Sequence, residues 1–347
     1  MDPAAVNVNV TVDDFDSIIT YENPSLWDTP DPSIPDFPGE MGVNTPWWMG
    51  TFHETRQVGA VVGFNFTGPA IYVYGNSGPA FGSFEVNLDG IKTNYSAYAA
   101  KNATTPYVLF KADNLTYSKH QLSFKNLGAG SQGPGDIFFL DYMQQTIQVA
   151  PAGATVSNVT VQEDDPAISY SGDWGNNTST NFNGGGTTFT HQNGASMTFT
   201  FNGSAIYVFG DKKNDHGLYQ VTVDSNPPEL YDDVSGCGSA FAMTCEQQKP
   251  CLKFLGSNLG EGQHTMKIEN IAPGDLSFFD FDSITLTVPS VYAPRDLDPN
   301  NGTSASGGVS GPKSSGLASA SAALTPAVNL QIIFLYFFAM ALLNRRV

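Results

Sequence analysis

Polar and apolar side chains alternate in short runs along most of the chain. The clearest run is residues 196–201 (SMTFTF), in which every second side chain from Met197 onward is apolar. Residues 218–223 (LYQVTV) and 264–268 (HTMKI) alternate in the same way. A period of two over four to eight residues is typical of a β-strand with one buried face. These segments are therefore predicted to be half-buried strands.

Residues 205–209 (AIYVF) are apolar at every position, which indicates a central strand covered on both faces. Asn202, Gly203 and Ser204 form a tight-turn sequence that joins this strand to the run before it. No stretch before residue 317 shows a helical period of 3.6. Short strands separated by turns predict an all-β chain built as antiparallel sandwiches of the jelly-roll type.

The chain contains an internal repeat of about 140 residues, which is the size of an independent domain. Three blocks, 59–66, 68–75 and 82–89, match 194–201, 203–210 and 217–224 with a constant offset of 135. Flanking matches pair Asp13-Asp14 with Asp164-Asp165, 19–21 with 168–170, 120–126 with 264–270, and 139–142 more loosely with 280–283. We therefore predict one sandwich at 1–150 and a second at 151–291.

Composition narrows the class of protein further. The 347 residues carry 15 Lys plus Arg against 33 Asp plus Glu, a net charge of −18. An acidic surface repels phosphate backbones, which excludes nucleic acid as a partner. Aromatic residues make up 12% and charged residues only 14%, so the chain can build sizeable cores. A helical bundle, a coiled coil and a multi-span membrane protein are also excluded.

The end of the chain predicts a membrane anchor. Residues 292–321 form a Gly- and Ser-rich stalk, and residues 322–347 contain an apolar run followed by Arg345 and Arg346. Residues 322–343 would span about 33 Å as a transmembrane helix. Alternatively, Ser314-Ser315-Gly316 is the attachment triplet of a GPI signal. Either interpretation makes the lipid bilayer a partner and places the protein in the membrane at the cell surface, with its ectodomain outside.

N-glycosylation sequons support an extracellular history. The chain has ten of them, at Asn9, Asn65, Asn94, Asn102, Asn114, Asn158, Asn176, Asn177, Asn202 and Asn301. Residues 1–16 lack the basic and apolar regions of a secretory leader, so we interpret the sequence as a mature form or a truncated gene model; the alternative is a cytosolic tail-anchored protein. The three cysteines, Cys237, Cys245 and Cys251, lie close together and predict one local disulfide with one thiol left over.

The second repeat carries a recognisable succession of motifs. It runs from Ile-x-Tyr-Ser-Gly-x-Trp (168–174) through Gly-Ala-Ser-x-x-Phe-x-Phe (194–201) and Tyr-x-Val-x-Val-Asp (219–224) to Gly-x-His-x-x-x-Ile-x-Asn (262–270). This succession resembles galactose-binding-like jelly-roll domains, and more narrowly the tandem ectodomains of an uncharacterised family of fungal membrane-anchored surface proteins. The resemblance implies the fold and says little about a ligand.

Carbohydrate binding needs an aromatic face for the C–H side of a sugar and polar groups for its hydroxyls. The candidates are Trp27, Trp47, Trp48, Trp174 and Asp173. The competing interpretation makes Trp27 and Trp174 equivalent plugs at one end of each sandwich. Asp13-Asp14 and Asp164-Asp165 are expected to be solvated at strand starts, and Asp280 and Asp282 to be satisfied polar positions.

The sequence contains no catalytic motif. It has no G-x-S-x-G elbow, its five histidines show no metal-ligand spacing, and Gly184-Gly185-Gly186 lacks the Lys-Ser/Thr of a phosphate loop. No metal and no cofactor are expected. We therefore predict a non-enzymatic, membrane-anchored surface glycoprotein that binds carbohydrate or mediates contact. The alternatives are a glycan-processing enzyme or its accessory module, and a structural wall protein without a ligand.

Overall fold

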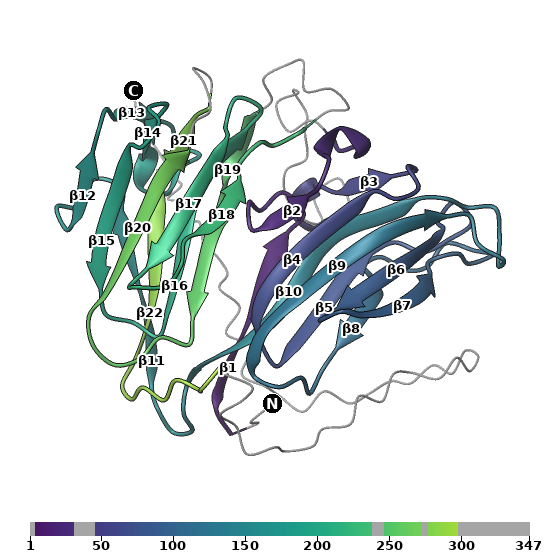
Figure 1. The fold of residues 1–347 in the computed structure, drawn as a ribbon, viewed down its shortest axis with the longest axis horizontal. Helices are drawn as coiled ribbons and strands as arrows, with labels where there is room; N and C mark the ends of the chain where they lie inside the picture. Colours follow the sequence, from purple (N-terminus) through teal and green to yellow (C-terminus); the bar gives the residue numbers. More distant parts are fainter. Residues whose placement is uncertain (1–3, 31–45, 238–245, 272–276, 298–347) are drawn as a thin grey trace, which may run out of the picture.

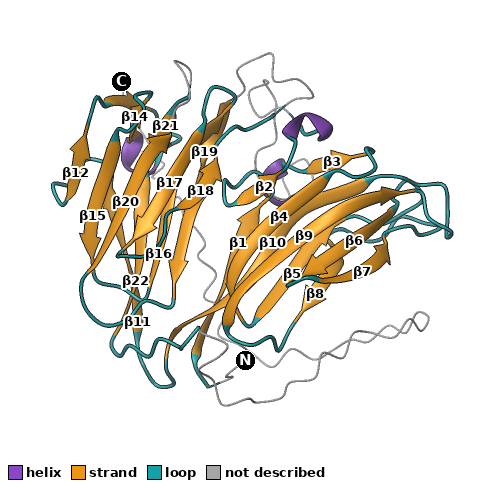
Figure 2. Ribbon diagram, in the orientation of Figure 1, coloured by secondary structure: helices purple, strands orange, loops and turns teal. Residues whose placement is uncertain are grey.

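The computed structural model describes residues 4–30, 46–237, 246–271 and 277–297. Strands dominate these ranges, and they stack into two groups of sheets side by side (Figures 1 and 2). All strand pairs within the named sheets are antiparallel, which confirms the predicted fold class of two tandem antiparallel β-sandwiches. The predicted C-terminal helix and stalk, at 292–347, lie almost entirely outside the described residues.

The N-terminal sandwich contains β1 (Val6–Asp13), β2 (Ile19–Tyr21), η1 (Pro24–Leu26), η2 (Trp48–Gly50), β3 (His53–Thr55), β4 (Val61–Gly68), β5 (Ala70–Gly75), β6 (Ser83–Leu88), β7 (Ile91–Ser96), β8 (Tyr107–Ala112), β9 (Ser118–Gly128) and β10 (Phe138–Ala150). One sheet has the order β1-β10-β5-β8, with β3 also pairing with β10, and the facing sheet has the order β2-β4-β9-β6-β7.

The C-terminal sandwich contains β11 (Val156–Gln162), β12 (Ile168–Ser171), β13 (Gly175–Thr178), η3 (Asn183–Gly185), β14 (Gly186–Thr190), β15 (Ser196–Phe201), β16 (Ala205–Lys213), β17 (Leu218–Val223), β18 (Glu229–Asp232), β19 (Glu246–Ser257), β20 (His264–Ile271), β21 (Phe279–Phe281) and β22 (Ser283–Pro289). Its sheets have the orders β11-β22-β16-β19, β12-β15-β20-β17-β18 and β13-β14-β21.

The strand patterns predicted from the sequence appear in the burial of these elements. In β15, Met197, Phe199 and Phe201 are all buried, as the alternation predicts. β16, which begins with the apolar run 205–209, lies between β22 and β19, and its first four residues are buried. Burying these side chains removes about 25 cal/mol of unfavourable hydration per Å² of apolar surface, which is the main stabilising term of each sandwich.

Matched hydrogen bonds show the internal repeat in space. The ring of His120 lies 2.7 Å from a carboxylate oxygen of Asp89, and the ring of His264 lies 2.8 Å from Asp224 in the same way. The second nitrogen of each ring contacts a carbonyl oxygen four residues earlier in the chain. Both histidines therefore link the start of a strand to a turn by hydrogen bonds, so their role is to stabilise the fold.

The start of the repeat aligns differently from the sequence prediction. The Tyr21 hydroxyl donates to the carbonyl of Asp14, and the Tyr170 hydroxyl donates to the carbonyl of Glu163. Asp14 therefore corresponds to Glu163, and the predicted match of Asp13-Asp14 with Asp164-Asp165 is wrong by two residues. The Asp-Asp dipeptide is the same in both copies, but the hydrogen bonds of the turn decide the register.

The two sandwiches share a buried contact although none of their described strands pair across it. Ala205, Tyr207 and Leu252 of the C-terminal sandwich belong to the same buried apolar cluster as the core of the N-terminal sandwich. The backbone N–H of Ser17 donates to the carbonyl of Leu252, and the N–H of Leu252 donates to the carboxylate of Asp16. The two sandwiches thus have separate sheets, but they pack against each other and share these hydrogen bonds between loop and strand.

This contact explains why one expectation about acidic residues is wrong. Asp13 and Asp14 are buried rather than solvated, with Asp14 accepting from Thr51 and lying 2.6 Å from the ring of His53. Burial and the neighbouring carboxylate of Asp13 raise the pKa of Asp14 well above its usual range. Residues 48–53 and the C-terminal sandwich cover this strand end, which a single-strand pattern does not reveal.

Several predictions concern residues that the structure does not describe or modifications that it does not test. Among the described residues, no helix has both the length and the apolar character needed to cross a bilayer. The predicted membrane segment lies at 322–347, outside these ranges, as does Asn301. The other nine sequon asparagines are all exposed, and their glycosylation stays a prediction.

Replacing Leu252 with alanine tests whether the shared contact couples the two sandwiches. Leu252 is 4% exposed, and a buried Leu→Ala change typically costs about 2–5 kcal/mol. We expect a lower melting temperature with the unfolding of both sandwiches shifted together in calorimetry. Leu230→Ala is the control, because Leu230 is 60% exposed and its loss should change the melting temperature little. A shift confined to one of two separate transitions would contradict the coupling.

Candidate functional site

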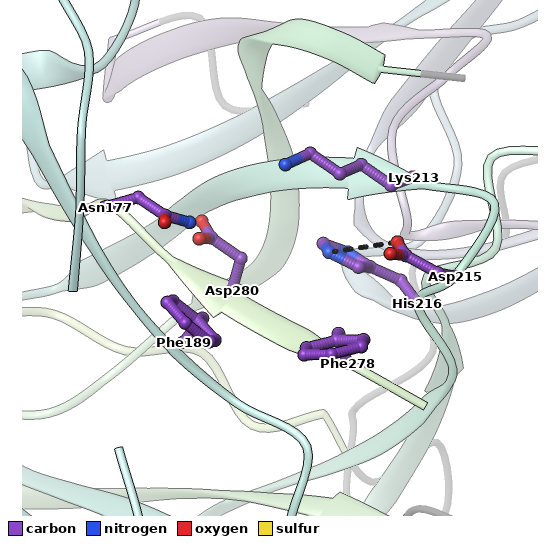
Figure 3. A pocket seen from close by; sticks show the side chains of 7 residues that line it. All are labelled: Asn177, Phe189, Lys213, Asp215, His216, Phe278 and Asp280. Carbon is purple, nitrogen blue, oxygen red and sulfur yellow. Dashed lines mark ion pairs between the residues drawn. The ribbon is translucent and has the colours of Figure 1, made fainter. Parts of the chain in front are cut away.

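A small polar cavity opens in the C-terminal sandwich between β13, β14, β16 and β21 (Figure 3). Its volume is about 190 Å³, and it is lined by Asn177, Phe189, Lys213, Asp215, His216, Phe278 and Asp280. The rings of Phe189 and Phe278 lie on one side of the cavity, and the ammonium group of Lys213 lies on the other. Asp280 and the His216–Asp215 pair approach it from different elements.

Asp280 is the buried carboxyl group of the cavity, and its surroundings change its pKa. It is 1% exposed, accepts from the Thr187 hydroxyl at 2.6 Å, and accepts from the backbone N–H of Asp211 at 3.2 Å. Burial first, and then the nearby Asp211 carboxylate, raise the pKa of Asp280 to about 7. Asp280 therefore holds a proton through mildly acidic conditions and can give it up near neutral pH.

His216 is held by a second carboxylate behind the cavity. Its Nδ1 lies 3.0 Å from Asp233, and its Nε2 lies 3.4 Å from Asp211 and 4.0 Å from Asp215. Burial alone would raise the pKa of Asp233, but the adjacent Lys253 and His216 hold it well below its usual range. An ionised carboxylate can only accept, so His216 carries a proton on Nδ1 and turns Nε2 toward the cavity side.

Lys253 supplies the positive charge that keeps Asp233 ionised. Its ammonium group forms a buried ion pair with Asp233 and lies 5.0 Å from the centre of the Phe279 ring. Both partners of the pair are fully buried. A buried pair of this kind needs further hydrogen bonds to offset its desolvation, and Asp233 also accepts from the Ser17 hydroxyl.

The same place in the N-terminal sandwich shows what the fold itself requires. Gly75 and Gly210 correspond, because a Cβ at Gly75 would meet the Phe139 carbonyl and the Leu109 side chain. A Cβ at Gly210 would meet the Asp280 carbonyl and the Lys253 side chain. Leu109 therefore corresponds to Lys253, and Phe139 corresponds to Asp280.

Two more correspondences follow from matched bridges and hydrogen bonds. Phe81 bridges to Ile137 as His216 bridges to Phe278, so Phe81 corresponds to His216. The N–H of Ala97 donates to the carbonyl of Gly82, and the N–H of Asp233 donates to the carbonyl of Gly217. Ala97 therefore corresponds to Asp233.

An apolar cluster in one copy is thus a charged cluster in the other. In the N-terminal sandwich, Phe81 and Phe139 pack edge-to-face with ring centres 6.1 Å apart, and Phe52 stacks on Phe139. Since burying charged groups costs free energy that aromatic packing does not, the fold does not need His216, Asp233, Lys253 and Asp280. The charged cluster is therefore a feature of the C-terminal copy that the shared fold does not require.

Asp282, in contrast, has an aspartate as its counterpart in the N-terminal sandwich. Its carboxylate accepts from the backbone N–H of Asn183 at 3.1 Å, and Asp141 accepts from the N–H of Trp48 at 2.8 Å. Burial raises the pKa of both groups, to about 8 for Asp282 and about 7 for Asp141. Asp282 and Asp141 therefore accept the backbone hydrogen bond of the same short turn in the two sandwiches. The role of Asp282 is to stabilise the fold, whereas Asp280 lines the cavity.

The sequence-predicted sugar-binding residues do not line this cavity. Trp27 is 3% exposed and packs against Tyr21 and Phe138. Trp174 occupies the equivalent place against Tyr170 and Phe279. These contacts match the interpretation of both tryptophans as plugs at one end of each sandwich.

The other predicted residues lie elsewhere on the molecule. Trp47 packs against Phe52 and Phe139, and Trp48 lies beside Tyr142, with both tryptophans half-buried. Asp173 is exposed next to Trp174. A sugar-binding role for these residues stays a prediction.

Cys237 and Cys251 lie in a small buried cluster with Phe15, near the contact between the sandwiches. Cys237 is disulfide-bonded, and Cys251 is a buried thiol whose pKa is raised by burial. Cys245 is outside the described residues. Within the described ranges, no group of three or more His, Cys, Asp or Glu side chains is arranged to hold a metal ion.

Comparison with known proteins gives two curated relatives. The chain is 26% identical over 245 residues to the A type blood alpha-D-galactosamine galactosaminidase of Flavonifractor plautii, covering 70% of this chain and 21% of the relative. It is 38% identical over 80 residues to the A type blood N-acetyl-alpha-D-galactosamine deacetylase of the same organism, covering 23% and 10%. The chain therefore spans about a fifth or less of the length of these relatives. No family model matches it.

Solved structures overlap only loosely. A family two carbohydrate esterase from Cellvibrio japonicus has a TM-score of 0.27 at 17% identity, covering 41% of this chain and 36% of that chain. The ANXUR2 extracellular domain from Arabidopsis thaliana has a TM-score of 0.27 at 8% identity, covering 84% and 100%. Both TM-scores are too low to relate the function of this chain to that of either structure.

The curated relatives correct the expectation of a non-enzymatic surface protein. Both are named for enzymatic activities on galactosamine sugars, so the prediction that the chain is not an enzyme is contradicted. Contiguous sequence motifs give no sign of the cavity. Its charged residues come from strands and turns between 213 and 280, and only folding brings them together.

A double-mutant cycle tests whether the charged cluster destabilises the fold. Lys253→Leu introduces the residue type of the other copy but leaves Asp233 buried without its cation, which should cost about 3–5 kcal/mol. Adding Asp233→Ala, again the residue type of the other copy, should restore more than half of that loss in denaturant unfolding. A double variant as unstable as Lys253→Leu alone would show that the fold needs this charge.

The raised pKa values predict a pH dependence of stability. Asp280 and Asp282 titrate at about 7 and about 8 in the folded state, against about 3.9 when unfolded. The folded state therefore binds more protons, and the free energy of unfolding should fall as pH rises from 5 to 8. Asp282→Asn should flatten this decline and raise the melting temperature at pH 8, whereas exposed Asp173→Asn should follow the wild type. A wild-type melting temperature that rises over this range would contradict the assignment.

Proposed function

We propose that this protein takes part in glycan processing, with the cavity at Asp280 as the site that handles a terminal amino sugar. The observation that carries the proposal is the charged cluster of Asp280, His216, Asp233 and Lys253, which stands where the other copy of the fold has an apolar core. The names of the two curated relatives, which concern galactosamine and N-acetylgalactosamine, support the sugar class.

The cavity is lined by two carboxyl groups, Asp280 and Asp215, which are the residue type that hydrolyses glycosidic bonds in pairs. Asp280, with its pKa raised to about 7, is the proposed general acid, which gives its proton to the departing glycosidic oxygen. Asp215 is the proposed second carboxylate, which takes a proton from the water that attacks the anomeric carbon. Phe189 and Phe278 would bear the C–H face of the sugar, and Lys213 would bond its hydroxyls.

An accessory sugar-binding module of a larger glycan-processing enzyme is the second candidate. The observation that favours it is the short share of the relatives that the chain covers, 21% of one and 10% of the other. The same cavity would then bind the sugar without cleaving it. The two candidates share the binding site and differ in turnover.

The test is a paired assay of cleavage and binding with the full chain. We expect para-nitrophenyl α-galactosaminide or its N-acetyl form to be cleaved, with kcat falling as pH rises through about 7 because Asp280 loses its proton. Asp280→Asn removes that proton and should lower kcat at least about 100-fold, within the range of general acid catalysis. The surface variant Glu261→Gln is the control and should leave cleavage unchanged, because Glu261 is exposed and does not line the cavity.

Calorimetric titration with free galactosamine and N-acetylgalactosamine separates the two candidates. Saturable binding that Asp280→Asn weakens, without cleavage, would assign the chain to the accessory role. Absence of both cleavage and binding at millimolar sugar, or equal behaviour of Asp280→Asn and wild type, would contradict the proposal.

The proposal also covers the domain boundary, the membrane anchor and the glycosylation that the sequence predicts. We place the boundary between the sandwiches near residue 150, and we propose that residues 292–347 tether them outside the cell as a stalk and membrane anchor. The nine exposed sequon asparagines support glycosylation and hence an extracellular setting. Peptide mapping after treatment with an N-glycosidase would test the sequons directly.

A further inference from the structure

A residue of the N-terminal sandwich reaches the charged cluster of the other sandwich. The Ser17 hydroxyl donates to Asp233 at 2.5 Å, although 216 residues separate them in sequence. Ser17 is 1% exposed and Asp233 is fully buried. Asp233 in turn holds Nδ1 of His216, so the contact lies one step behind the cavity.

The backbone fixes Ser17 in this place from both sides. The N–H of Ser17 donates to the carbonyl of Leu252, the residue next to Lys253, at 3.1 Å. The carboxylate of Asp16 accepts from the N–H of Leu252 at 2.7 Å and from the N–H of Asp13 at 2.8 Å. These bonds hold the turn after β1 and the strand β19 in one arrangement, so the hydroxyl has little freedom to leave Asp233.

The repeat gives an independent reason to regard Ser17 as specific to this site. The turn hydrogen bond from Ile19 to Asp16 matches the bond from Ile168 to Asp165, which makes Pro166 the counterpart of Ser17. Proline offers no hydroxyl and no N–H, yet the turn has the same form. The turn therefore does not need a serine for its own structure.

We infer that the N-terminal sandwich completes the cavity of the C-terminal one, with Ser17 acting as a positioning residue that orients Asp233 and, through it, the His216 ring. Asp233 has three partners: Lys253, His216 and Ser17. Lys253 can rotate its ammonium group about a long stem, whereas Ser17 is short and fixed. Ser17 thus determines which carboxylate oxygen faces His216. The catalytic part of this inference rests on the proposed function, and the orientation of the ring does not.

The test observes the ring and the reaction separately, in the full chain. In wild type, the proton on Nδ1 of His216 should give a protected downfield resonance in the ¹H NMR spectrum, assigned by its loss in His216→Gln. Ser17→Ala should broaden or remove this resonance and lower kcat about tenfold with little change in KM. Ser17→Thr keeps the hydroxyl and should retain the resonance.

Ser204→Ala is the matched control, because Ser204 is a buried serine whose hydroxyl contacts the Thr287 carbonyl instead of the charged cluster. It should keep both the resonance and kcat. An unchanged resonance in folded Ser17→Ala would overturn the inference, as would its loss in Ser17→Thr and Ser204→Ala alike. If no sugar is cleaved or bound, the proposed function fails, while the NMR comparison still decides whether Ser17 orients the ring.

Discussion

The charged cluster depends on the buried ion pair between Lys253 and Asp233. Two charges removed from water lose several kcal/mol of hydration each, and their attraction offsets this only when the geometry is good and other hydrogen bonds are satisfied. Here Asp233 receives bonds from Lys253, His216 and Ser17 at once. Without the pair, His216 would lose its fixed orientation and Lys253 would be an unpaired charge among the Tyr219 and Phe279 rings.

Duplication explains how a small sandwich can carry such a cluster. The N-terminal copy keeps leucine, alanine and phenylalanine at the corresponding places and packs as an ordinary apolar core. The C-terminal copy replaces these residues with charged ones and gains stability elsewhere, through its own core and through the contact that buries Tyr207 and Leu252. The comparison within one chain separates what the fold requires from what the cavity requires.

The sequence contained enough to predict the fold but only part of the site. Alternation at 196–201 and the apolar run at 205–209 identify strands, because burial of one face or both faces leaves a direct trace in residue type. The loose match of 139–142 with 280–283 set Phe139 opposite Asp280, and extending the constant offset of 135 by one residue places Phe81 opposite His216. A change from apolar to charged at a buried repeat position was therefore the available signal. The tryptophans were a poorer guide, because aromatic side chains occur in plugs and cores as readily as in sugar sites.

Other parts of the site leave no local trace in the sequence. Ser17 lies in a turn whose counterpart in the other sandwich contains Pro166, and its role arises only from the docking of one sandwich on the other. Asp13 and Asp14 look solvated at a strand end and are buried by residues 48–53 and by the neighbouring sandwich. Contacts between units depend on surface shape, which repeats and periodicity do not encode.

The arrangement also explains why two buried acids in one cluster hold opposite protonation states. Lys253 lies close enough to favour the ionised form of both Asp233 and Asp280. Because Asp233 forms the direct ion pair with Lys253, the cation lowers the pKa of Asp233 far below its usual range. At Asp280 the effect of Lys253 is outweighed by burial and by the nearby Asp211 carboxylate, which together raise the pKa of Asp280 to about 7. Direct contact with the lysine thus separates the ionised carboxylate from the carboxyl group that keeps a proton near neutral pH, which is the property that proton donation to a departing group needs.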